Sequence, residues 1–205
     1  MTKEINLKEM EKKAWKSCFQ DGLWDIFLGL ILIGFGIAPL IEEITGITYL
    51  ISYILLLSLG YIIFYSGKKY ITVPRIGNVK FGSKRKLKKI KVVLILVISV
   101  IFGLAAIVLT QIDIKPYNID VSIWGIIFAI NALIVFSLMA YYLDFPRLYI
   151  YSIFFAISIF IIETSSSHVG STYDNVIGFG MLGVVILLVG ILHLTRFVRR
   201  YPLQR

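Results

Sequence analysis

The chain has 205 residues and a formal net charge of +9, and 58% of its residues are hydrophobic. A water-soluble domain of this size could not bury so many apolar side chains, so the composition excludes an ordinary soluble enzyme. The sequence predicts an all-α fold: a polytopic membrane helix bundle with six transmembrane helices and both termini in the cytoplasm.

Residues 1–22 are predicted to form a cytoplasmic amphipathic segment. Leu7, Met10, Ala14 and Cys18 follow one another at helical spacing among many charged residues. Such a helix would lie on the inner leaflet with Trp15 at the interface. The alternative, a helix packed on the cytoplasmic ends of the bundle, is equally compatible with this pattern.

Six apolar runs predict the membrane domain, which covers residues 23–195. The runs lie at 23–41, 47–65, 92–111, 121–143, 147–163 and 175–195, and a helix needs about 20 apolar residues to cross a bilayer core. A basic cytoplasmic loop is predicted at 66–91 and a basic cytoplasmic tail at 196–205. The fifth run would measure only about 22 Å between Leu148 and Ile162 as a helix. It is therefore expected to extend through Ser167 or to lie in a thinned region of the bilayer.

Basic residues are confined almost entirely to one side of the predicted bundle. With the amino terminus inside, Lys115 is the single exception among the 21 Lys and Arg residues. Short loops rich in Lys and Arg stay in the cytoplasm, so this asymmetry predicts the orientation.

A dense basic cluster precedes the third run and predicts contact with anionic lipid head groups. It consists of Lys84, Arg85, Lys86, Lys88, Lys89 and Lys91. The alternative is that these residues only fix the topology. The expected partners are membrane lipids, anionic on the cytoplasmic side, with a homo-oligomer or other membrane proteins left open. No nucleic acid is expected, because the positive charge meets the lipid surface first.

The loop at 66–91 carries a β-like pattern and a family resemblance. Residues 70–81 are rich in β-branched and aromatic residues around a proline and a Gly-Asn pair, which predicts a small hairpin. The stretch Pro74-Arg75-Ile76-Gly77-Asn78-Val79-Lys80-Phe81 resembles an inner loop of small multi-pass membrane proteins of bacteria and archaea. The resemblance extends to Asp21-Gly22-Leu23-Trp24-Asp25 and the glycines that follow. It implies the plasma membrane of a prokaryote and one shared working face for Arg75 and Asp25, but it implies no particular activity.

Small residues and one amide predict how the helices pack. Glycines recur every seven residues in the first and sixth runs, at Gly22, Gly29 and Gly36 and at Gly183 and Gly190. Small residues at this spacing let helix backbones approach closely in lipid. Asn131 is a strongly polar group near the middle of a run, and it is expected to form an interhelical hydrogen bond.

No catalytic, cofactor-binding or metal-binding residues are predicted. The sequence lacks nucleotide loops and hydrolase motifs, and two separated histidines with one cysteine do not make an ordinary zinc site. Ionisable groups beside the apolar runs remain as a candidate functional cluster, made of Asp25, Arg75, Asp144, Arg147 and His193. Asp25 is expected to pair with one of the inner arginines. A local pair is expected between Asp144 and Arg147, and Asp21 is expected to cap the first helix.

Three functions are compatible with this sequence. The first is an accessory or scaffold protein that acts through lateral helix contacts and anionic-lipid binding, which the scarcity of polar groups in mid-membrane favours. The second is a small oligomeric transporter or channel with Asp25 as a coupling group. The third is a membrane enzyme that acts on lipid head groups, and the missing nucleophile–base pair argues against it.

Overall fold

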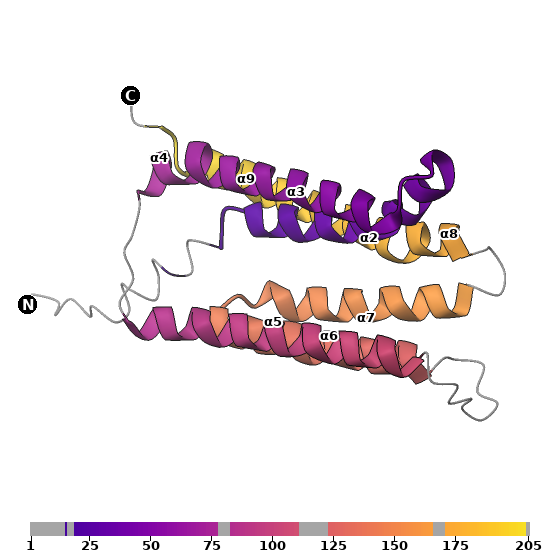
Figure 1. Cartoon of the computed structure of the whole chain (residues 1–205). Helices are drawn as coiled ribbons and strands as arrows, with labels where there is room; N and C mark the ends of the chain where they lie inside the picture. Colours follow the sequence, from indigo (N-terminus) through magenta and orange to yellow (C-terminus); the bar gives the residue numbers. More distant parts are fainter. Residues whose placement is uncertain (1–14, 16–18, 78–82, 111–122, 166–170, 204–205) are drawn as a thin grey trace, which may run out of the picture.

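The structure is a computed structural model that describes residue 15 and residues 19–77, 83–110, 123–165 and 171–203. Within these ranges every regular element is a helix, which confirms the predicted fold class. The elements are α2 (Leu23–Thr45), α3 (Tyr49–Gly67), η1 (Lys68–Thr72), α4 (Val73–Ile76), α5 (Ser83–Thr110), α6 (Ile123–Leu143), α7 (Arg147–Ser165), α8 (Ser171–Asn175), η2 (Val176–Gly180) and α9 (Met181–Arg200). They form two layers, one of α2, α3, α8 and α9 and the other of α5, α6 and α7 (Figure 1).

Five helical stretches are long and apolar enough to cross a bilayer. They are Leu23–Thr45, Tyr49–Ile76, Arg85–Ala106, Gly125–Leu143 and Thr172–Arg200. The apolar part of α7, Arg147–Ile162, is shorter, so the sixth span and the sidedness of the bundle stay predictions. Large apolar side chains are exposed along the outer surfaces of the helices, as expected where lipid surrounds the bundle.

Glycines bring α2 and α9 into close contact, as the sequence predicts. A Cβ on Gly29 would lie 2.7 Å from the backbone nitrogen of Leu187, and one on Gly190 would lie 2.6 Å from that of Ile26. Gly22 and Gly183 meet the partner helix at similarly short range, and Gly36 meets Gly180 at the end of η2, directly before α9. Because lipid provides no hydrophobic force between helices, this close approach is what holds the pair together.

The predicted hairpin is wrong in its described part, since Tyr70 to Ile76 is helical. The helix of α3 continues through the wide turn of η1 into α4 and ends at Gly77, whose φ of 77° suits a glycine. Hydrogen bonds from Lys68 and Thr72 of η1 to Asp21, just before α2, override the β-like pattern. Residues 78–82 lie outside the described part. Because α5 begins at Ser83, the basic cluster also lies on a helix, and much of the segment predicted as a loop is helical.

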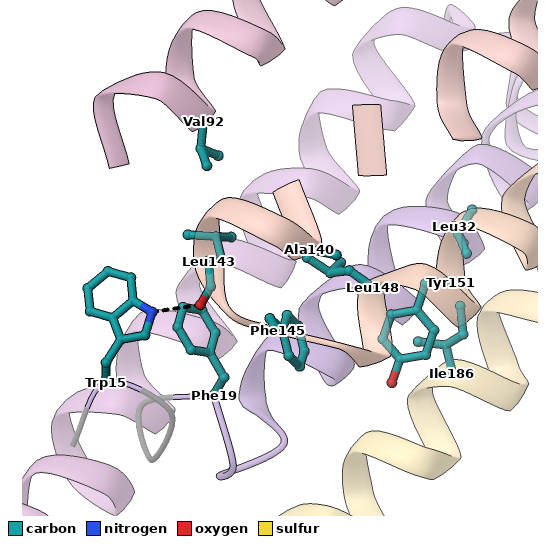
Figure 2. Packing of buried hydrophobic residues seen from close by; sticks show 10 residues of the cluster. All are labelled: Trp15, Phe19, Leu32, Val92, Ala140, Leu143, Phe145, Leu148, Tyr151 and Ile186. Carbon is teal, nitrogen blue, oxygen red and sulfur yellow. Dashed lines mark hydrogen bonds between the residues drawn. The ribbon is translucent and has the colours of Figure 1, made fainter. Parts of the chain in front are cut away.

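A buried apolar cluster joins the layers at the basic end of the bundle, where η1 begins, α6 meets α7 and α9 ends (left in Figure 1). Figure 2 shows its ten residues: Trp15, Phe19, Leu32, Val92, Ala140, Leu143, Phe145, Leu148, Tyr151 and Ile186. Trp15 is 1% exposed, and its indole nitrogen donates a hydrogen bond of 2.6 Å to the carbonyl of Leu143. Of the two predictions for the amino-terminal segment, the structure therefore supports packing on the bundle at Trp15, the residue of that segment's first 18 that it describes. Residues 1–14 and 16–18 lie outside the described part.

Candidate functional site

A buried ion pair connects the two layers near the basic end. Asp25 of α2 is fully buried, and its Oδ2 lies 2.7 Å from Nη1 of Arg147 on α7. The hydroxyl of Tyr151, one turn further along α7, donates a hydrogen bond of 2.7 Å to the other carboxylate oxygen. A second nitrogen of Arg147 donates to the carbonyl of Phe19. The predicted pairing of Asp25 with an inner arginine is confirmed.

Asp21 performs the predicted capping role and also fixes η1. One carboxylate oxygen accepts a hydrogen bond of 3.2 Å from the backbone N–H of Leu23. The other accepts from Nζ of Lys68 and from the hydroxyl of Thr72, both at 2.6 Å. The carboxylate is fully buried, and its contacts remain within one layer of the bundle.

The predicted pair of Asp144 and Arg147 is wrong. Asp144 lies in the turn between α6 and α7 with a φ of 54°, and it pairs with Arg85 at 2.6 Å and Lys88 at 3.3 Å on α5. Arg147 instead pairs with Asp25, whose side chain is fully buried. Partial burial alone would raise the pKa of Asp144, but hydrogen bonds and positive charge from Arg85 and Lys88 outweigh it and lower that pKa below its ordinary value.

A pocket of about 480 Å³ opens at the basic end between the α6–α7 turn and the end of α9. We call it the basic pocket. It is lined by Phe19, Gln20, Asp144, Phe145, Pro146, Arg147, His193, Arg196, Phe197, Arg200 and Tyr201. It therefore brings together three of the predicted cluster residues, Asp144, Arg147 and His193.

The positive charge of the basic pocket comes mainly from two residues that the site prediction omitted. Arg196 and Arg200 have no acidic partner within the described part of the chain, whereas Asp144 is occupied by cations of α5. The sequence prediction placed Arg196 and Arg200 in the basic tail at 196–205, but α9 continues to Arg200. With His193 they follow the spacing i, i+3 and i+7, which marks one helix face and is a signal visible in the sequence.

Two members of the predicted cluster do not line the basic pocket. Asp25 lies behind it and reaches it only through Arg147. Arg75 lines an adjacent pocket of about 340 Å³ with Pro74, Arg200, Tyr201 and Pro202. The predicted cluster is thus divided over a buried pair and two neighbouring pockets, and its functional role stays a prediction.

Several residues of the basic cluster on α5 are engaged within the protein. Arg85 and Lys89 lie over the ring of Trp15 at 5.0 and 5.4 Å from its centroid, and Lys91 lies 5.5 Å from the centroid of Tyr142. Arg85 and Lys88 also hold Asp144. Lys86 is exposed, and the side chain of Lys84 lies outside the described part. Lipid contact by this cluster stays a prediction.

The middle of the bundle is mainly apolar. The predicted interhelical bond is confirmed, because the amide of Asn131 on α6 donates to the hydroxyl of Ser99 on α5 at 3.0 Å. Both residues line a cavity of about 750 Å³ between the layers, and most of its other lining side chains are aliphatic or aromatic. The described lining residues therefore offer no continuous polar track across the bundle.

Tyr151 is a further residue that the sequence reasoning missed. It lies within an apolar run, where a tyrosine is usually an ordinary packing residue, and only its position four residues after Arg147 links it to the ion pair.

Comparisons with protein-family models, with curated proteins and with solved structures found no significant match to this chain. The chemistry of the basic pocket is therefore the basis for a functional proposal.

Proposed function

We propose that this chain is an accessory or scaffold protein of a prokaryotic plasma membrane that binds the phosphate of an anionic lipid in its basic pocket. The observation that carries the proposal is the pair of arginines, Arg196 and Arg200, that face this pocket without an acidic partner in the described chain. The assignment to a prokaryotic plasma membrane is supported by the asymmetry of the basic residues and by the resemblance of the loop that contains Arg75.

The donor groups of the pocket suit a phosphate. A guanidinium presents several N–H groups in a planar fork that matches phosphate oxygens and keeps its charge at any physiological pH. Gln20 and His193 add polar groups at the same rim. Two guanidiniums at one rim that have no acidic partner among the described residues repel each other, so an anion between them relieves repulsion as well as forming hydrogen bonds.

The shape of the pocket suits a ligand that arrives from the bilayer. It lies between the end of α9 and the start of α7, and these two helices touch at only a few residues. Apolar side chains are exposed along the outer surface of α9, among them Leu188, Ile191 and Leu192. A lipid bound here would place its head group at the arginines and keep its acyl chains in the surrounding bilayer. Basic pockets between transmembrane helices are a recurrent way to bind anionic head groups.

The two alternative functions have weaker support. A path for a polar solute would need more polar groups than the mainly apolar cavity around Asn131 offers. A hydrolase would need an activated nucleophile. The described lining of the basic pocket contains no serine, threonine or cysteine, its Asp144 is held by cations of α5, and no described hydrogen bond pairs His193 with a base. Binding without chemistry therefore agrees best with these residues.

The test is lipid binding by purified protein, measured by native mass spectrometry with phosphatidylglycerol and with phosphatidylcholine as probes. Arg196→Gln removes one exposed guanidinium from the pocket and leaves every described internal bond intact. One charge-assisted hydrogen bond contributes about 1.5–3 kcal/mol, so affinity for phosphatidylglycerol should fall about ten-fold or more.

Arg199→Gln is the matched control, because Arg199 is also exposed on α9 but does not line the pocket. It removes the same charge from the same end of α9 but no pocket contact, so the affinity for phosphatidylglycerol in detergent should stay within about two-fold of the wild-type value. Equal losses in the two variants, or equal affinity of the wild-type protein for both lipids, would refute the proposal.

A further inference from the structure

A second arginine-lined pocket adjoins the basic pocket at the end of α9. We call it the Arg75 pocket, and it is lined by Pro74, Arg75, Arg200, Tyr201 and Pro202. Arg200 and Tyr201 line both pockets. The two cavities are therefore neighbours that share one guanidinium, and α4 lies beside the end of α9 (Figure 1).

Arg75 is held in place but its donors are not all used. Its Nη1 donates a hydrogen bond of 2.8 Å to the carbonyl of Ile71, one turn earlier. Its Nε is buried and has no hydrogen-bond partner, and no described carboxylate pairs with it. A buried N–H without a partner is unfavourable, so native structures rarely retain one unless a ligand or water completes it.

The local fold fixes where this guanidinium lies. The wide turn of η1 shifts the register of α4 relative to α3. The hydrogen bonds of Lys68 and Thr72 to Asp21 anchor that turn to α2. Gly77 then ends the helix directly after Arg75 and Ile76. Arg75 is thus presented to the end of α9 by a segment that is anchored on one side and terminated on the other.

We propose that the basic pocket and the Arg75 pocket together bind a lipid that carries two phosphates. One phosphate lies at Arg196 and Arg200, and the other lies between Arg200 and Arg75. This inference rests on the proposed function, because it assigns the basic pocket to the first phosphate. Once that phosphate is bound, binding of the second is intramolecular, so two moderate sites give one tight site without any further contact.

The test compares two-phosphate lipids with a one-phosphate lipid. The probes are cardiolipin, whose two phosphates are joined by a glycerol, undecaprenyl diphosphate, whose two phosphates share a bridging oxygen, and phosphatidylglycerol, which has one phosphate. Affinities are measured by native mass spectrometry of the full chain in detergent. The wild-type protein should prefer at least one two-phosphate lipid over phosphatidylglycerol by about ten-fold or more, the effect of one additional charge-assisted contact. Whichever two-phosphate lipid is preferred identifies the spacing that the pockets accept.

Arg75→Gln should abolish this preference and leave the affinity for phosphatidylglycerol within about two-fold of the wild-type value, because Arg75 does not line the basic pocket. Arg75→Lys keeps the charge and should retain part of the preference. Arg199→Gln should change neither affinity. A thermal unfolding curve for each variant checks that the bundle is intact.

Failure of the inference and failure of the proposed function give different results. If Arg196→Gln weakens phosphatidylglycerol binding but Arg75→Gln leaves the preference unchanged, the second phosphate site is wrong and the proposed function stands. If Arg196→Gln has no effect on phosphatidylglycerol, the proposed function is wrong and the inference falls with it. A wild-type protein without any preference for two phosphates overturns the inference alone.

Discussion

Replacing Asp25 by asparagine tests whether the buried ion pair holds the two layers together. Asp25 is fully buried and Arg147 is 21% exposed, with 2.7 Å between their charged atoms. The asparagine is nearly the same size, and its oxygen can still accept the hydrogen bond from Tyr151. The change therefore removes the negative charge and little else, and Arg147 remains as an unpaired cation at the layer junction.

The expected loss of unfolding free energy depends on the interactions that Arg147 retains in the Asp25→Asn variant. Breaking a buried ion pair by removing one partner costs about 3–5 kcal/mol of unfolding free energy. Arg147 retains some contact with solvent and its hydrogen bond to the carbonyl of Phe19, so we expect a value near the lower end, about 3 kcal/mol. Arg147→Gln alone should cost a similar amount, since it leaves the carboxylate of Asp25 buried without its cation.

The assay is equilibrium unfolding in mixed micelles, followed by tryptophan fluorescence. The double variant should be less destabilised than the sum of the single variants, by about 0.5–3 kcal/mol. Glu43→Gln, an exposed change at the opposite end of the same helix, is the control and should stay within about 0.5 kcal/mol of the wild type. A loss below about 1 kcal/mol for Asp25→Asn, or strictly additive losses in the double variant, would contradict this account of the layer junction.

Three further predictions concern packing and pH. Gly190→Ala places a methyl group 2.6 Å from a backbone nitrogen of α2 and should destabilise the bundle by about 1–3 kcal/mol; in the same unfolding assay, Gly103→Ala, whose Cβ would meet its nearest neighbour at 4.0 Å, should be close to neutral. Asp144 has a lowered pKa in the folded state, so its contribution to stability is complete above the unfolded pKa of about 4 and is lost as the pH falls through the folded pKa. Asp144→Asn, which suits the same left-handed backbone, should therefore flatten the acid limb of the stability–pH curve, and an unchanged limb would contradict the assignment. Asn131→Leu and Ser99→Ala should each cost about 0.6 kcal/mol, and because they remove the same bond, a double variant that loses the full sum would show that the bond contributes nothing.

The bilayer explains why the architecture could be predicted from the sequence. Apolar runs of the required length and the seven-residue glycine spacing are local features, and lipid allows few ways to use them. The structure accordingly confirms the helical bundle and the glycine contact between α2 and α9. The hairpin prediction failed because it used residue preferences alone, whereas the contacts of Asp21 with Lys68 and Thr72 extend the helix.

The charged partners could be predicted only in part. That Asp25 needs a cation follows from its position beside an apolar run. Which cation it receives depends on how far the helices are rotated and on which layer each belongs to, and neither is encoded in local spacing. Proximity in the sequence suggested that Asp144 would pair with Arg147, but α5, the neighbour of α6 in the same layer, brings Arg85 and Lys88 to Asp144.

The double role of Arg147 leads to a prediction with opposite signs for stability and binding. Arg147 lines the basic pocket, yet its charge is compensated by Asp25. A phosphate in the pocket therefore competes with Asp25 for this guanidinium, and the two interactions weaken each other reciprocally. Asp25→Asn removes the competitor, so it should raise the affinity for phosphatidylglycerol about five-fold, which corresponds to roughly 1 kcal/mol of binding free energy. The same change should lower the stability of the protein without bound lipid. Native mass spectrometry at a temperature where the variant is folded measures the affinity. If affinity and stability fall together, Arg147 does not reach the bound phosphate, and Arg196 and Arg200 alone must hold it.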